Sequence, residues 1–173
     1  AFGMNVSAFP EYALVLFAAN KLGLPVKWVS DRSEAFLSDT HGRDQIIEAE
    51  LAFDSTLRIV GLRASKLSAM GAYVTGDGPE MATNQFFKVF GHTYVVPVLH
   101  VRVRGVATNT APIAAYRGYG KPEAISVVER LIERAASELG VDRIDLRRRN
   151  LIRAAAMPYT NASGKTYDCG DFE

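Results

Sequence analysis

The spacing of apolar residues predicts two principal helices. Residues 10–22 begin with a proline and are followed by a glycine, which suit the first turn of a helix and the position after its last. Residues 13–19 are apolar on all sides, so this helix is expected to be buried. Residues 122–139 are expected to form the second helix, because apolar positions recur there at helical spacing. These positions are Ala124, Val128, Leu131, Ala135 and Leu139.

Alternation of apolar and polar residues predicts the strands. Residues 46–53 alternate strictly, and a turn at residues 54–55 leads into a second strand over residues 57–67, which predicts a hairpin. Residues 98–106 alternate in the same way, and a further short strand is predicted over residues 25–29.

Three shorter helices are expected between these elements. One follows Ser33, one spans residues 84–90 and one follows Asp142, since serine and aspartate are common N-cap residues. No internal repeat or linker divides the chain. Separated hairpins and helices predict an α+β fold, with mixed or antiparallel strands and packed helices, in a single domain over residues 1–173.

The composition agrees with a globular domain and excludes several classes of protein. Of 173 residues, 48% are hydrophobic and 10% are aromatic, which excludes a disordered chain. The 20 Lys and Arg residues are balanced by 19 Asp and Glu, so charge indicates neither a nucleic-acid nor a membrane partner. No apolar run approaches the roughly 20 residues that a membrane span needs. Cys169 is the only cysteine, which excludes an internal disulfide and a cysteine-ligated iron–sulfur or zinc site within this sequence.

The segment over residues 109–123 is the strongest candidate for a binding site. Its small apolar residues lead into Tyr116-Arg117-Gly118-Tyr119-Gly120, directly before the long helix. The glycines let the backbone approach a ligand closely, and the N-terminus of a helix favours an anion. Arg117 could form paired hydrogen bonds to a phosphate or carboxylate, and Tyr119 could stack on a flat ring. An ordinary loop explains the same pattern, and on pattern alone that interpretation is favoured.

The other notable residues favour structural roles. The three histidines lack the spacing of metal ligands, and no nucleophile elbow, Walker loop or Rossmann fingerprint occurs, so no catalytic or metal-ligating residue is assigned. The three arginines over residues 147–149 indicate the solvated face of a short helix, because a nucleic-acid patch would need interleaved aromatic residues. Trp28, Phe86 and Phe87 are expected in the core.

Six motifs follow one another along the whole chain. They are AFG at its start, the predicted helix that opens with PEY, PVKWVSDRSEAF, NTAPIAAYRGYGKPEA, LRRRNLI and SGKTYDCGDF. In this order they resemble the molybdenum-binding large subunit of the xanthine dehydrogenase family, and especially large subunits of the aerobic carbon monoxide dehydrogenase type. The resemblance implies that the chain is part of a molybdopterin-binding domain.

The resemblance also implies an activity. Members of this family are oxidoreductases that hydroxylate a carbon centre with oxygen from water, using a molybdenum pyranopterin cofactor. Iron–sulfur clusters and FAD are then expected on partner subunits or domains of the same enzyme, in agreement with the single cysteine here. The cytoplasm is taken as the default compartment.

Five residues are assigned to the cofactor site by the resemblance. Phe2 and Gly3 match a glycine-rich loop beside the metal. Arg117 matches an arginine that contributes to the pterin site, and Tyr116 and Gly118 flank it.

Three further positions bear on the substrate. Tyr119 matches an aromatic residue that packs on the substrate near the metal. Purine-oxidising members have a glutamate where this chain has Val6 and an arginine where it has Gln85, and a purine needs polar partners for its ring atoms. Members that oxidise carbon monoxide carry a cysteine after the arginine, and residues 118–120 contain none. An aldehyde or an N-heterocycle is therefore expected.

The ends of the sequence lead to a further expectation. The family's catalytic base is a glutamate near the C-terminal end of the full subunit and has no counterpart here. The chain opens with AFG rather than methionine and ends shortly after a glycine turn, so a fragment of a larger subunit is expected. Such a fragment should be inactive alone and should self-associate through exposed apolar surface. The alternative hypothesis is a non-catalytic binding or scaffold domain that retains the fold.

Overall fold

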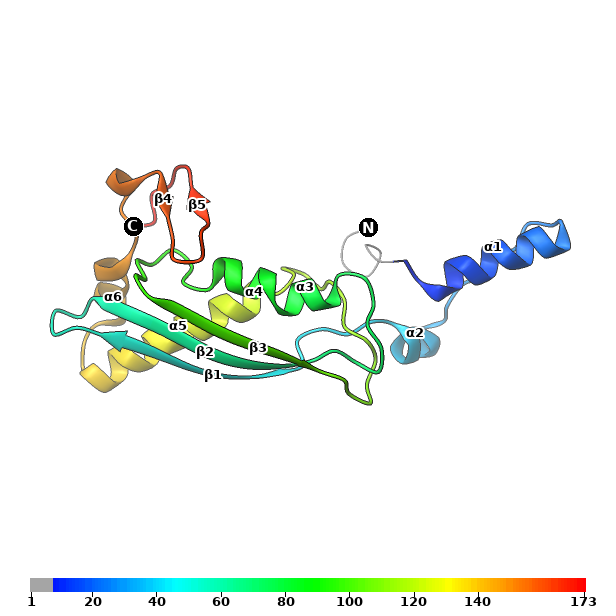
Figure 1. Cartoon of the computed structure of the whole chain (residues 1–173), viewed down its shortest axis with the longest axis horizontal. Helices are drawn as coiled ribbons and strands as arrows, with labels where there is room; N and C mark the ends of the chain where they lie inside the picture. Colours follow the sequence, from blue (N-terminus) through cyan, green and yellow to red (C-terminus); the bar gives the residue numbers. More distant parts are fainter. Residues whose placement is uncertain (1–7) are drawn as a thin grey trace.

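The computed structural model describes residues 8–173. The predicted site residues Phe2, Gly3 and Val6 lie outside this range. A three-stranded sheet and the helices packed against it form the body of the molecule, and the first two helices project from one end of it (Figure 1). The predicted α+β class with mixed strands is confirmed.

The predicted hairpin forms the first half of the sheet. β1 (Gln45–Phe53) and β2 (Ile59–Ala69) are antiparallel neighbours. The carboxylate of Asp54 closes the turn between them by accepting the backbone N–H groups of Thr56 and Arg58, at 2.8 and 3.0 Å. Asp54 therefore fixes the register in which the alternating residues of β1 face the core.

The third strand joins the sheet through a crossover. β3 (Leu99–Val106) pairs with β2 in parallel, and a parallel pair needs a long connection between its strands. The connection contains α3 (Gly78–Ala82) and α4 (Asn84–Val89). Phe86 and Phe90 from this connection are fully buried, with ring centroids 5.0 Å apart. The crossover thus supplies large core side chains and also brings α3 beside the candidate binding segment.

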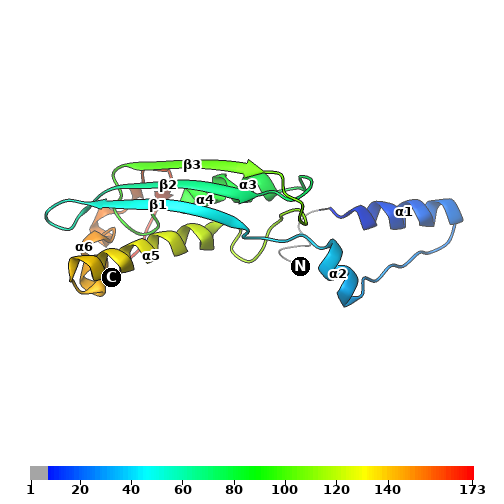
Figure 2. The ribbon, with the colours of Figure 1, turned by 90° about the horizontal axis from the view of Figure 1, so that it is seen from below.

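The long helix α5 (Lys121–Leu139) runs along one face of the sheet (Figure 2). Its apolar residues four positions apart are buried: Ala124, Val128, Ile132 and Ala136. The helix lies where the sequence predicts it, but Leu131 and Ala135 are only partly buried and Leu139 is 49% exposed. Over the second half of the helix, the residues that face the sheet are each one position later than predicted: Ile132 in place of Leu131, and Ala136 in place of Ala135.

Asn150 ties the end of α6 (Arg143–Asn150) to the hairpin. Its side chain is buried, accepts the backbone N–H of Ile59 at 2.8 Å, and donates to the carbonyls of Leu57 and Leu146, each at 2.9 Å. All three partners are backbone groups at buried or part-buried positions, where water does not readily replace a lost hydrogen bond. One side chain therefore joins segments that are far apart in the sequence.

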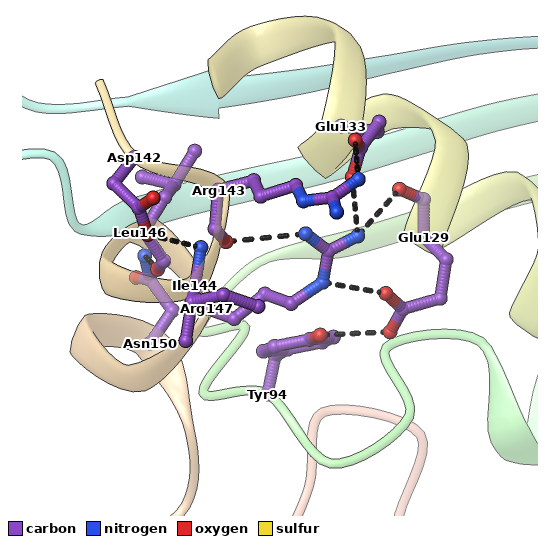
Figure 3. A network of polar contacts seen from close by, with 9 residues as sticks. All are labelled: Tyr94, Glu129, Glu133, Asp142, Arg143, Ile144, Leu146, Arg147 and Asn150. Carbon is purple, nitrogen blue, oxygen red and sulfur yellow. Dashed lines mark hydrogen bonds and ion pairs between the residues drawn. The ribbon is translucent and has the colours of Figure 1, made fainter.

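Arg147 departs from the predicted solvated face. Its side chain is 21% exposed and forms ion pairs with Glu129 at 2.9 Å and Glu133 at 3.0 Å, both on α5 (Figure 3). The hydroxyl of Tyr94 donates to the same Glu129 carboxylate at 2.7 Å, and burial and this contact raise the pKa of Tyr94. Arg148 is exposed as predicted. The network holds α6 against α5. This tertiary contact could not be predicted from the run of three arginines alone.

The short helices begin as their sequences suggest, with one change of cap. Asp142 caps the helix that follows it. The helix α2 (Arg32–Ser38) is capped by Asp31 rather than Ser33, because the Asp31 carboxylate accepts the N–H of Glu34 while the Glu34 side chain accepts the N–H of Asp31. This reciprocal pair is a capping box.

The N-terminal part of the described chain differs from the prediction. The helix α1 (Pro10–Leu22) forms where expected, but none of its residues is buried. Residues 25–29 do not form a strand, since no other strand lies beside them to satisfy their backbone, and Trp28 is 47% exposed. The apolar side chains of this part therefore lie on a surface that no other segment of residues 8–173 covers.

The remaining elements are small. The tail predicted as a loop contains a 3₁₀ turn at Ala154–Ala156 and a hairpin of β4 (Tyr159–Thr160) and β5 (Thr166–Tyr167). Among the residues that the structure describes, no helix combines the length and the apolar character needed to cross a membrane.

Replacing Asn150 by alanine should lower the free energy of unfolding by about 2–4 kcal/mol, because two buried hydrogen bonds and one part-buried hydrogen bond to the backbone are lost. The free energy of unfolding is measured by urea denaturation of the protein that contains this sequence. Hydrogen exchange of the β1 and β2 amides reports the unfolding of the sheet. Asn20→Ala, at an exposed position of α1, is the matched control. Equal stability of the two variants would contradict the role assigned to Asn150.

Candidate functional site

The turn over residues 116–120 has an unusual backbone. Gly118, Tyr119 and Gly120 all have positive φ, at 95°, 54° and 82°. A Cβ at Gly120 would lie 2.3 Å from the carbonyl oxygen of Met81, and one at Gly118 would lie 2.3 Å from the Pro122 ring. Glycine is therefore required at both positions, by conformation and by space.

A buried segment leads into this turn. Residues 112–115 are buried, although they form no helix or strand. The backbone of His41 holds them, donating its N–H to the carbonyl of Pro112 at 2.9 Å and accepting the N–H of Ala114 at 3.0 Å. The hydroxyl of Thr75 donates to the carbonyl of Ile113 at 3.0 Å. Small apolar residues suit this segment because neighbouring backbone lies so close.

The same segment borders a hollow of about 360 Å³. Residues 8–11 and 109–112 line it, together with parts of residues 37–40 and 72–75. Residues 8–11 and residues 109–112, which are distant in the sequence, therefore meet at this hollow.

The predicted cofactor residues that the structure describes are accessible. Tyr116 is 56% exposed, and Arg117 and Gly118 are also exposed. Within residues 8–173 the guanidinium of Arg117 takes part in no hydrogen bond or ion pair. A free cation beside backbone N–H groups and the start of α5 suits an anionic ligand with several hydrogen-bond acceptors.

The predicted substrate residues Tyr119 and Gln85 are brought together by Glu80. The amide of Gln85 donates to Glu80 Oε1 at 2.7 Å, and the hydroxyl of Tyr119 lies 3.4 Å from Glu80 Oε2. Burial and the nearby carboxylates of Asp77 and Glu80 raise the pKa of Tyr119 to about 12. The phenol therefore stays protonated near neutral pH and serves as a donor.

A cluster of charged side chains beneath the turn was not predicted. Lys66 is buried on β2, donates to the carbonyl of Ala82 at 3.0 Å and lies 4.6 Å from the centre of the Phe86 ring. Burial lowers its pKa to about 8, and the charge of Glu123 opposes this effect. The signal for Lys66 was available, since it follows Leu62 and Ala64 at the inward positions of an alternating strand.

The chain belongs to the family of molybdopterin cofactor-binding domains, whose family model matches residues 1–151. It is 35% identical over 173 residues to the carbon monoxide dehydrogenase large chain of Hydrogenophaga pseudoflava, covering 99% of this chain and 22% of the relative. It is 36% identical over 160 residues to the 6-hydroxypseudooxynicotine dehydrogenase complex subunit gamma of Paenarthrobacter nicotinovorans, covering 92% of this chain and 20% of the relative.

A solved structure shares the same architecture. Quinoline 2-oxidoreductase from Pseudomonas putida 86 superposes with a TM-score of 0.90 at 36% identity, over 97% of this chain and 22% of that one. The family resemblance drawn from the six motifs is thereby confirmed. The chain accounts for only a minor share of each of these relatives' length.

The shifted pKa of Lys66 predicts a pH dependence of stability. Between about pH 8 and pH 10.5 the unfolded chain keeps the Lys66 proton and the folded chain does not. Unfolding then takes up a proton, so the contribution of Lys66 to stability rises as the pH increases through this window, and it is smallest below about pH 8.

The variant Lys66→Met should remove this rise. Urea midpoints of the protein and of the variant are measured at about pH 7 and about pH 10. The change of midpoint between the two pH values gives the slope of stability against pH for each. The exposed Lys165→Met is the control, and it should keep the slope of the unmodified protein. An unchanged slope in Lys66→Met would show that Lys66 titrates normally in the folded chain.

Proposed function

We propose that this chain forms one wall of the cofactor and substrate site of a molybdenum hydroxylase, an oxidoreductase whose full site needs further segments. The turn over residues 116–120 carries this proposal, because it presents the exposed residues Tyr116, Arg117 and Gly118 shortly after Pro112, which lines the hollow. When bound, the molybdenum pyranopterin cofactor supplies oxidative hydroxylation with oxygen from water.

Tyr116, Arg117 and Gly118 are proposed to hold the cofactor from one side. The Arg117 guanidinium offers two parallel donors to an anionic oxygen pair, which a lysine could not reproduce. Gly118 lets the turn pack against the Pro122 ring and keeps the exposed residues Tyr116 and Arg117 directly before α5. Phe2 and Gly3 are proposed for the opposite side, in line with the hollow that residues 8–11 share with residues 109–112.

Tyr119 and Gln85 are proposed to face the substrate, with Val6 as a further contact. Glu80 accepts one N–H of the Gln85 amide, and this neutral amide lacks the charge that the arginine of purine-oxidising members offers at this position. Residues 118–120 contain no cysteine, unlike the corresponding residues of members that oxidise carbon monoxide. An N-heterocycle or an aldehyde is the proposed substrate, and the solved relative named for quinoline acts on an N-heterocycle.

Iron–sulfur and FAD subunits or domains of the same enzyme are the proposed partners, and the cytoplasm is the proposed compartment by default. The relative from Paenarthrobacter nicotinovorans is named as a subunit of a complex, which supports an assembly of this kind. Residues 1–173 alone are proposed to be inactive, since no catalytic residue is assigned within them.

Replacing Arg117 by alanine should reduce the molybdenum and pterin content of the protein that contains this sequence, expressed at its natural length with its partners. The lost pair of charge-assisted hydrogen bonds corresponds to about 10- to 100-fold in affinity. Elemental analysis and pterin quantification of the purified protein measure the change. Arg130→Ala, on the exposed side of α5, is the control and should keep full content.

Two outcomes would contradict the proposal. Equal cofactor content in Arg117→Ala and Arg130→Ala would remove Arg117 from the site. Absence of molybdenum from the unmodified protein in its assembled form would instead favour a non-catalytic binding or scaffold domain that retains the fold.

The isolated chain is also proposed to self-associate. Large apolar side chains of α1 and α2 are exposed, among them Leu16 at 71%, Phe17 at 65%, Phe36 at 68% and Leu37 at 84%. Exposure of several large apolar side chains is unfavourable in water. Light scattering of residues 1–173 should give a mass above that of one chain, and Leu16→Lys with Leu37→Lys should lower it. A monomer at every concentration tested would contradict this expectation.

A further inference from the structure

Arg43 has a strained backbone next to the candidate site. Its φ is 69°, in the left-handed region that residues other than glycine seldom adopt. Such a conformation persists only where the surroundings hold it. The backbone of His41, two residues earlier, is bonded on both sides to the buried segment at Pro112 and Ala114, so the chain at Arg43 is held beside the turn.

The Arg43 side chain contacts three parts of the turn and of the helix after it. Its guanidinium lies over the Tyr116 ring, 4.6 Å from the ring centre, and donates a hydrogen bond to the carbonyl oxygen of Arg117. Its Nε lies 3.4 Å from Glu123 Oε1 in the first turn of α5. Gly42 adds to this contact, since a Cβ there would lie 3.3 Å from the Tyr116 Cβ.

Glu123 is a buried ion-pair partner of Arg43. Its side chain is 7% exposed, and its other oxygen, Oε2, is buried without a hydrogen-bond partner among residues 8–173. Glu123, Arg43 and the buried Lys66 line one small cavity beside Met81 and Ile113. A buried carboxylate placed among cations in this way cannot move without losing its compensation.

From this geometry we infer that Arg43 is a positioning residue for the cofactor turn. It fixes Tyr116 and the backbone of Arg117 relative to α5, so that the exposed Arg117 side chain starts from a fixed backbone position. The inference rests on the proposed function for its link to the cofactor. The planar fork of arginine is required, because a lysine cannot reach the carboxylate and the carbonyl while stacking on the ring.

Arg43→Gly is the sharpest test. Glycine adopts the left-handed backbone without strain, so only the side-chain contacts are lost. In cofactor-free protein of natural length, hydrogen exchange of the Tyr119 and Lys121 amides, which donate to Tyr116 and Gly118, should become about tenfold faster. Exchange over residues 127–139 of α5 should stay unchanged. Arg43→Lys should restore the protection only in part.

The second readout is cofactor retention. Arg43→Gly should lower affinity for the molybdenum cofactor by about tenfold, the usual effect of a residue that acts through a binding residue. Glu123→Gln should speed the same amides less, and adding it to Arg43→Gly should cause little further change, because the two side chains act as a pair. Arg130→Ala serves as the control and should match the unmodified protein in both measurements.

The outcomes separate this inference from the proposed function. Unchanged exchange at Tyr119 and Lys121 in Arg43→Gly, or equally faster exchange over residues 127–139, would overturn the positioning role. Faster exchange confined to the turn, with cofactor content unaffected by Arg117→Ala, would overturn the proposed function while Arg43 still positions the turn.

Discussion

The contact between the turn at Gly120 and the carbonyl of Met81 is the constraint on which the candidate site depends. A single added carbon at Gly120 would lie 2.3 Å from that oxygen, so the turn can approach α3 only with glycine at this place. The parallel crossover from β2 to β3 is what brings α3 there. The position of the turn therefore depends both on the topology of the sheet, which places α3, and on glycine at position 120, which lets the turn pack against α3.

The opposite end of the molecule determines the direction of α5. Arg147 bridges Glu129 and Glu133, and Asn150 bonds to the backbone of the hairpin, so the C-terminal half of α5 and all of α6 are held to the sheet. The N-terminal end of the same helix carries the turn. A polar network far from the hollow thus contributes to the position of Arg117 through one rigid helix.

The site is built from segments that are distant in the sequence. The hollow combines residues 8–11 and 109–112 with parts of residues 37–40 and 72–75, and only residues 109–112 are close to the turn in the sequence. The helices α1 and α2, which carry exposed apolar side chains, project from one end of the molecule (Figure 1), and residues of both helices line this hollow. The chain belongs to one family of cofactor-binding domains, and it covers a minor share of the length of the matched relatives.

Local patterns allowed the main elements of the sheet and the long helix to be predicted. Alternation defined β1, β2 and β3, and the spacing of apolar residues defined α5, because each pattern reflects which side of one element faces water. The same rule misled at α1 and at Trp28, whose apolar residues face no partner within residues 8–173. An apolar pattern reports that a surface avoids water, and it does not report what covers that surface.

By itself, the sequence determined the family, the hairpin and the long helix, since each is encoded in neighbouring residues or in ordered motifs. Only the tertiary structure decided the parallel pairing of β3, the left-handed backbone at Arg43 and Tyr119, and the cluster of Arg43, Lys66 and Glu123. Those features depend on groups that are distant along the chain and meet only after folding. A buried charge or a strained residue is tolerated there because its partners arrive from several elements at once.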